Sequence, residues 1–132
     1  MKRFILLLCS VFNLGMICCK QAPSKGVVKT VSPKEVQALL IENAMLLIDV
    51  RTPKEFKGGH IEGAQNIDLF SATFDSDIEK LDKTKPVILY CKSGGRSAKS
   101  GRKLLNAGFT EIYDLRGGIT RWEKEGFEIK LH

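Results

Sequence analysis

The stretch VILYCKSGGRSAKSGRKLLNAGF, residues 87–109, places a cysteine between a predicted strand and a predicted helix. The four apolar or aromatic residues before Cys91 have the length and composition of a strand that is buried on both faces. Small, polar and cationic residues follow, and residues 97–107 then carry apolar side chains at helical spacing before Gly108. The sequence therefore predicts a strand, a turn that begins at Cys91, and a helix.

The turn after Cys91 has the composition of an anion-binding loop. Ligands of open parallel sheets bind beyond the carboxyl ends of the strands, which is where Cys91 would lie. The glycines allow backbone N–H groups to point into one concavity, and the following helix dipole, Lys92 and Arg96 add positive charge. Such a site should lower the pKa of Cys91 from ~8.5 by about one to several units. The alternative is a buried structural cysteine, a common role for this residue.

The remainder of the chain alternates short strands with helices. Ser32 and Thr52 each precede a proline and stand three residues before a glutamate, which is the pattern of a helix start with a capping box. The expected strands are 26–31, 45–50, a short one within 61–68, 87–90 and 112–115, and later helices are expected at 76–81, 97–107 and 118–125. This alternation predicts an α/β layered fold with a mostly parallel sheet.

Length and charge narrow the class of protein. A chain of 132 residues with 43% hydrophobic and 27% charged residues is expected to form one globular domain. The net charge is +6, but the basic residues are scattered among acidic ones and form no block with aromatic residues. Nucleic acid is therefore not an expected partner, whereas mild positive charge favours small anions.

The first 19 residues hold three of the four cysteines and resemble an export signal. Lys2 and Arg3 precede an apolar stretch, 4–17, that is short for a membrane span and leads directly to Cys18 and Cys19. This pattern resembles a bacterial lipoprotein signal with Cys19 as the lipidated residue, although the usual small residues before that cysteine are partly missing. An uncleaved membrane anchor and ordinary secretion are the alternatives. We expect a signal peptide over 1–18, a tether over 19–26 and a domain over 27–132, in a protein that faces the periplasm from the cell envelope.

Four motifs in order resemble the rhodanese family, whose single-domain members are sulfurtransferases. CKSGGRS resembles the active-site loop C-x-x-G-x-R-S, and LLIDVRTPKEFKGGHIEGAQNID resembles the stretch with D-x-R, E-[FY] and G-H-I-x-G-A-x-N-I. Leu104, Leu105, Gly108 and Phe109 match the helix after the loop, and LRGGITRW resembles the closing L-x-G-G-x-x-x-W. The resemblance covers about residues 27–128 and implies a mostly parallel five-stranded sheet with helices on both faces.

The resemblance also implies a reaction and its residues. Cys91 would accept sulfur from a small anionic donor such as thiosulfate, form a persulfide and pass the sulfur to a thiol or cyanide, without a cofactor. The residues that would bind the substrate are Lys92, Ser93, Gly94, Gly95, Arg96 and Ser97. Asp49 and Arg51 would form a support pair near the loop, or else a helix-capping Asp and a surface Arg. His60 is expected to be structural, and Trp122 a packing residue.

Two other functions compete with this one. A cysteine-dependent phosphatase or arsenate reductase of related fold needs a loop that surrounds a tetrahedral oxyanion, typically with five residues between Cys and Arg. Here four residues separate Cys91 from Arg96, which favours a sulfur atom over phosphate. A non-catalytic persulfide carrier or docking module in the envelope is the second alternative. No metal site is expected, because the cysteines form no C-x-x-C pair and no His/Cys cluster.

The lipoprotein hypothesis predicts a defined mature chain. In a bacterial host that processes lipoproteins, mass spectrometry should show loss of residues 1–18 and a lipid on Cys19. Cys19→Ala should stay unprocessed, whereas Cys18→Ala should still be processed and lipidated. A membrane-bound chain of full length would indicate the uncleaved anchor, and a cleaved chain without lipid would indicate ordinary secretion; both results contradict the hypothesis.

Overall fold

Five parallel strands form one sheet in the computed structural model, which describes residues 26–42 and 44–132. The elements in chain order are β1 (Val27–Val31), α1 (Pro33–Glu42), β2 (Leu46–Asp49), α2 (Pro53–Lys57), β3 (Gln65–Asn66), α3 (Phe74–Glu79), β4 (Val87–Tyr90), α4 (Gly95–Asn106), β5 (Glu111–Leu115) and α5 (Gly118–Lys124). The strand order is β1-β5-β4-β2-β3, and every pairing is parallel. The predicted α/β fold with a five-stranded parallel sheet and helices on both faces is confirmed.

Capping boxes fix the starts of α1 and α2. The Ser32 amide donates to the Glu35 carboxylate at 2.7 Å, and the Glu35 amide donates back to the Ser32 hydroxyl at 3.3 Å. Thr52 and Glu55 exchange the same two bonds at 3.0 and 3.3 Å. Each box satisfies N–H groups that a helix start leaves without partners, so short local motifs determine where both helices begin.

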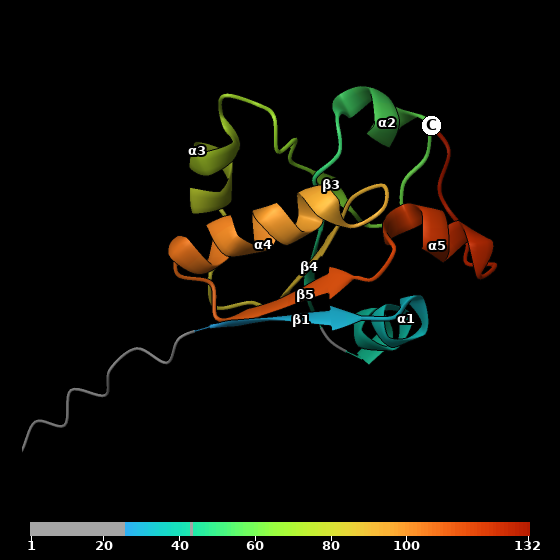
Figure 1. The fold of residues 1–132 in the computed structure, drawn as a ribbon, viewed down its shortest axis with the longest axis horizontal. Helices are drawn as coiled ribbons and strands as arrows, with labels where there is room; N and C mark the ends of the chain where they lie inside the picture. Colours follow the sequence, from blue (N-terminus) through green and yellow to red (C-terminus); the bar gives the residue numbers. More distant parts are fainter. Residues whose placement is uncertain (1–25, 43) are drawn as a thin grey trace, which may run out of the picture.

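The central strand β4 separates two apolar cores. Val87 and Leu89 pack into the core with α3 and α4, whereas Ile88 and Tyr90 pack into the core with α1 and α5. Figure 1 shows α3 and α4 on one side of the sheet and α1 on the other. All four residues of β4 are buried, as expected for a parallel strand covered on both faces. Cys91 follows directly and is therefore held by a rigid element.

Two helices begin earlier than the sequence predicted. α3 begins at Phe74, whose side chain is buried in the core, rather than at residue 76. α4 begins at Gly95 rather than residue 97, after a turn in which Gly94 has a φ of 123°. Such a φ is readily adopted only by glycine. The turn after Cys91 is therefore shorter than predicted, and Arg96 belongs to the first turn of α4.

The predictions for the N-terminal segment lie outside the described residues. These are the signal peptide over 1–18, Cys19 and all of the tether except residue 26. Within residues 26–42 and 44–132, no helix combines the length and the apolar character that a membrane crossing requires.

Candidate active site

The sheet order brings two predicted groups to one edge. β2 and β4 are neighbours, with Asp49 in register with Tyr90, so both strands end at the same level. Cys91 follows β4 directly, and Arg51 lies two residues after the end of β2. The carboxyl ends of parallel strands share one edge, and this geometry places the predicted support pair beside the cysteine turn.

Polar hydrogen-bonding groups surround the sulfur of Cys91. The Gly94 amide donates to Sγ at 3.1 Å, and the Ser97 hydroxyl oxygen lies 3.5 Å from Sγ. Cys91 is only 1% exposed, and Ser97 is fully buried. The positive φ of Gly94 turns its N–H group back toward the sulfur, which a residue with a side chain would resist. The sulfur therefore occupies a small nest at the N-terminus of α4.

This nest favours the ionised sulfur. Burial by itself raises the pKa of the Cys91 thiol, since a charge is less stable away from water. Hydrogen bonds from the Ser97 side chain and from the backbone of Ser97, Gly94 and Ser93 act in the opposite direction and outweigh burial. The net result is a pKa below the ordinary value of a cysteine, which is the property of a nucleophilic cysteine.

The Ser97 hydroxyl has one proton, and both the Gly94 carbonyl and the Cys91 sulfur lie within its reach. It can donate to the Gly94 carbonyl at 3.1 Å while the thiol donates to its oxygen at 3.5 Å. When the sulfur is ionised, the same hydroxyl proton can turn to Sγ. Ser97 therefore accommodates both protonation states of Cys91 without movement of the backbone.

Helix α5 holds the outer side of the turn. The Cys91 carbonyl accepts from the Ile119 amide at 2.9 Å, and the Lys92 carbonyl accepts from the Thr120 amide at 3.1 Å. This approach requires Gly118, where φ is 60° and a Cβ atom would lie 2.4 Å from the Lys92 oxygen. The sequence marks Gly118 only as part of a motif, and its role in supporting the turn is visible only in the fold.

Asp49 and Arg51 form a buried ion pair. Arg51 Nη2 lies 2.7 Å from Asp49 Oδ2, and its Nε lies 3.0 Å from both carboxylate oxygens. Asp49 is fully buried and Arg51 is 6% exposed, so the alternative of a surface arginine is wrong. Arg51 also donates to the Gly59 carbonyl at 2.7 Å, and Asn66 donates to the carbonyls of Asp49 and Arg51. The pair fastens the β2 end to the segment after α2.

Arg96, which the loop motif predicts as a substrate-binding residue, is paired with a carboxylate. It forms two bonds with the Glu55 carboxylate, at 2.7 and 2.8 Å. Glu55 also accepts from Thr52, so the capping box of α2 and the first turn of α4 share one carboxylate. Sequence reasoning missed this pair because Glu55 and Arg96 are 41 residues apart, and only the fold brings them together.

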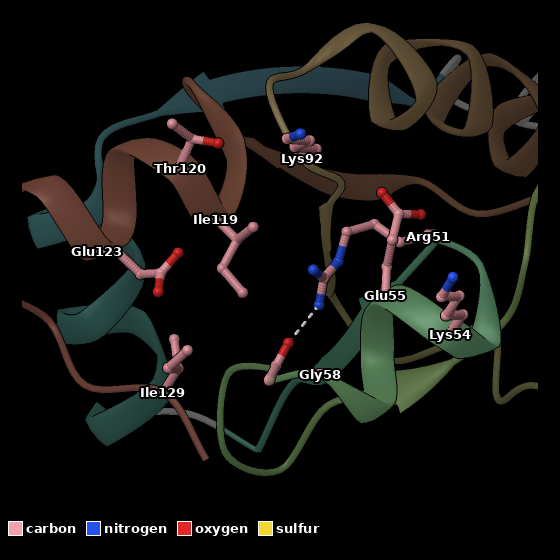
Figure 2. A pocket seen from close by; sticks show the side chains of 10 residues that line it. Arg51, Lys54, Glu55, Gly58, Lys92, Ile119, Thr120, Glu123 and Ile129 are labelled. Carbon is pink, nitrogen blue, oxygen red and sulfur yellow. Dashed lines mark hydrogen bonds between the residues drawn. The ribbon is translucent and has the colours of Figure 1, made fainter. Parts of the chain in front are cut away.

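A pocket of about 550 Å³ lies between α2 and α5 beside the turn. Figure 2 shows Arg51 pointing into it, with Lys92 at one side and Glu123 opposite. Lys54 and Glu55 also line it, so the pocket wall carries both cations and carboxylates. Of the other predicted loop residues, Ser93 and Gly95 are exposed, and Ser93 lines a separate depression with Thr120.

Two further predicted residues lie in packed surroundings. The His60 ring stacks on Phe56 with 3.9 Å between centroids, and its Nδ1 lies 3.1 Å from the Phe56 carbonyl. The buried Trp122 donates to the Glu128 carbonyl at 2.9 Å and contacts the Phe127 ring. Both arrangements are structural, as expected. In the described part of the chain, no group of three or more His, Cys, Asp or Glu side chains could hold a metal ion.

Comparisons with known proteins agree with this geometry. A family model described as "Rhodanese-like domain" matches residues 32–125, which include Cys91, its turn and Gly118. The uncharacterized protein YqhL of Bacillus subtilis is 37% identical over 121 residues, covering 92% of this chain and 92% of that protein. Thiosulfate sulfurtransferase 16, chloroplastic, of Arabidopsis thaliana is 37% identical over 93 residues, covering 63% of this chain and 78% of that protein.

Solved structures share the fold. The crystal structure of a rhodanese-related protein from Thermoplasma volcanium matches with a TM-score of 0.70 and 27% identity, covering 79% of this chain and 99% of that one. Some relatives are much longer. The chain spans 25% of the Mycobacterium tuberculosis protein named "Probable adenylyltransferase/sulfurtransferase MoeZ", to which it is 38% identical over 97 residues.

The close approach of α5 to the cysteine turn predicts a specific effect of Gly118→Ala. The added Cβ would collide with the Cys91 and Lys92 carbonyls, so the turn or the helix must move. We expect a loss of about 3 kcal/mol in unfolding free energy, measured by urea denaturation, together with a changed rate of Cys91 alkylation. Gly126→Ala is the matched control, because Gly126 also has a positive φ but its Cβ would meet nothing within 4 Å. Equal effects of the two substitutions would contradict a supporting role for α5.

The Glu55 network predicts a pH-dependent contribution to stability. Bonds from Arg96 lower the pKa of Glu55 to about 2, against the smaller raising effect of burial. Because the folded pKa is depressed, Glu55 stabilises the protein fully above pH ~4.5, and this contribution disappears as the pH falls toward 2.

Glu55→Gln should therefore lower the unfolding free energy by about 1 kcal/mol near neutral pH, with the difference shrinking between pH ~4.5 and ~2. Urea denaturation at a series of pH values measures this difference. Glu62→Gln, which removes an exposed carboxylate, controls for the loss of one charge. A difference between wild type and Glu55→Gln that stays constant over this range would show that the ion pair contributes nothing.

Proposed function

The chain belongs to the rhodanese-like domain family, and on this premise we propose that it is a sulfurtransferase that works through a persulfide on Cys91. The donor is a small anion of the thiosulfate type, and the acceptor is a thiol or cyanide. The observation that carries the proposal is the nest around Cys91, where the Gly94 amide donates to Sγ at 3.1 Å and Ser97 lies beside it. A named thiosulfate sulfurtransferase among the relatives supports the same chemistry.

The reaction has two displacement steps. In the first, the Cys91 thiolate attacks the outer sulfur of thiosulfate, a new S–S bond forms, and the old S–S bond breaks as sulfite leaves with the electron pair. In the second, the acceptor attacks the outer sulfur of the persulfide anion, and Cys91 leaves as a thiolate. With cyanide the product is thiocyanate, and one negative charge stays on the enzyme sulfur throughout. No proton and no redox partner is needed for this cycle.

The residues of the nest suit both sulfur anions. Backbone N–H groups at the start of α4 point to the place where negative charge is held, and they need no rearrangement during the reaction. The dipole of this 12-residue helix adds to the effect. Lys92 lines the adjacent pocket, where its charge favours an anionic donor. Arg96 is paired with Glu55, so we assign it to holding α2 against α4 rather than to binding the donor.

The cell envelope is the proposed location, and it rests on the sequence of residues 1–19 alone. A basic start, an apolar stretch and Cys19 support export and lipidation. In that setting the described domain would transfer sulfur at the periplasmic face of a membrane.

A sulfur-loading experiment tests the proposed reaction. Incubation of the protein with excess thiosulfate, followed by mass spectrometry under non-reducing conditions, should show a gain of one sulfur atom on the peptide that contains Cys91. Cys91→Ser should gain none, and release of thiocyanate on addition of cyanide should fall to the uncatalysed rate. A loaded wild type that transfers its sulfur only once, to a partner protein, would favour the persulfide carrier. The absence of any gain with thiosulfate, polysulfide and glutathione persulfide would contradict the proposal.

A further inference from the structure

A buried carboxyl group lies close to the nest and has no part in the two displacement steps. Asp114 on β5 is 7% exposed, and its Oδ1 accepts no hydrogen bond from any described residue. A buried polar atom without a partner is destabilising, and such atoms are uncommon in folded proteins. An apolar residue at this position would avoid this cost.

The position of Asp114 in the sheet brings it beneath the first turns of α4. Its register partner on β4 is Leu89, two residues before Cys91, and its partner on β1 is Thr30. Side chains two residues apart on a strand share one face of the sheet. Ile112 lies two residues earlier and packs in the core under α4, so Asp114 also faces α4.

Ser97 links Asp114 to Cys91. Burial raises the pKa of Asp114, and a hydrogen bond from the Ser97 side chain partly offsets that rise. The same hydroxyl lies 3.5 Å from Cys91 Sγ and 3.1 Å from the Gly94 carbonyl. One hydroxyl proton therefore has three acceptors around it, two of which can carry a negative charge.

Among the described residues, no cation is available to neutralise Asp114. Its neighbours on β1 and β4, Thr30 and Leu89, carry no charge. The cations of α4 are engaged elsewhere or exposed: Arg96 pairs with Glu55, Lys103 pairs with Asp75, and Lys99 and Arg102 are exposed. On the cysteine side, the charged neighbours are Lys92, which is exposed, and the paired Arg96. A charge on Asp114 thus acts on the Ser97 hydroxyl without a counter-ion.

We propose that Asp114 is a positioning residue for sulfur transfer, which competes with Cys91 for the Ser97 hydroxyl and so limits how strongly that hydroxyl stabilises the ionised sulfur. The proposal rests on the proposed function, because it assigns Asp114 a role in setting the reactivity of the same sulfur. Two anions that share one donor disfavour each other. An ionised Asp114 therefore keeps a larger share of Cys91 as thiol than the nest alone would keep.

The test is the pH profile of Cys91 in the full chain with Asp114→Asn, which keeps the shape of the side chain and removes its charge. Iodoacetamide alkylation of the Cys91 peptide is followed by mass spectrometry between pH ~4 and ~10, a range that spans the ordinary cysteine pKa. We expect the pH midpoint of Cys91 alkylation in Asp114→Asn to lie about half a pH unit to one pH unit below that of wild type. The acid limb of kcat/KM for thiosulfate should move in the same direction. Asp114→Ser, also neutral, provides a second variant if the first one folds poorly.

Two serine backgrounds test whether the effect of Asp114 passes through Ser97. Ser97→Ala removes the shared hydroxyl, and the Asp114→Asn shift should disappear in that background. Ser100→Ala is the matched control, because Ser100 is also buried on α4 but donates to the Arg96 carbonyl at 2.8 Å, and the shift should persist. If Asp114→Asn lowers the stability but leaves the Cys91 alkylation midpoint unchanged, the role of Asp114 is purely structural. If Asp114→Asn shifts the midpoint equally in the Ser97→Ala and Ser100→Ala backgrounds, Ser97 is not the link. Either result overturns the proposal.

The two experiments distinguish failure of the proposed sulfur transfer from failure of the role proposed for Asp114. If wild type gains no sulfur from any donor, the assignment of the reaction fails, whereas the Cys91 midpoints of wild type and Asp114→Asn are still measured. If sulfur loading succeeds and the midpoints coincide, only the role of Asp114 is refuted.

Discussion

The hydrogen bonds to the Cys91 sulfur impose the main constraint on this structure. For a buried sulfur to carry charge, several donors must reach it at once, and the protein supplies them from one turn: the backbone of Ser93, Gly94 and Ser97, and the Ser97 side chain. This geometry needs a strand that ends at Cys91, a glycine with positive φ, and a helix that begins immediately afterwards. Each requirement is met by a different feature of the sequence between residues 87 and 109.

Three other elements hold this turn in place. α5 donates to the Cys91 and Lys92 carbonyls, which leaves the backbone N–H groups of the turn free to point at the sulfur. The Asp49–Arg51 pair secures the neighbouring strand end, and the Glu55–Arg96 pair joins α2 to α4. The two pairs differ in what the loss of one partner costs. In the buried Asp49–Arg51 pair the remaining charge would be uncompensated, whereas solvent screens the charge that remains in the partly exposed Glu55–Arg96 pair. The direct support of the turn therefore comes mainly from the backbone bonds of α5, and the Asp49–Arg51 pair secures the neighbouring strand end.

The fold and the cysteine could be predicted from the sequence because both depend on local patterns. Ser32 and Thr52 cap their helices through residues three positions away, and β4 is recognisable from four consecutive apolar or aromatic residues. The pairing of Glu55 with Arg96 could not be predicted, since it depends on how α2 and α4 pack. The burial of Arg51 was equally hidden, because a charged residue after a strand is usually exposed. The position of Asp114 could not be predicted either, because in the sequence it is one polar residue of a strand, and only the strand register places it under α4.

The burial of the sulfur makes its ionisation the decisive property of the site. Without donors, a cysteine that is 1% exposed would titrate above the ordinary value of ~8.5, because desolvation opposes its charge. The hydrogen bonds of the nest lower the pKa of Cys91 by more than burial raises it. The most direct measurement is the ultraviolet absorbance of the thiolate as a function of pH, taken as the difference between wild type and Cys91→Ser. We predict a midpoint for Cys91 below the ordinary value of a cysteine, and a midpoint at or above the ordinary value would contradict the role of the nest.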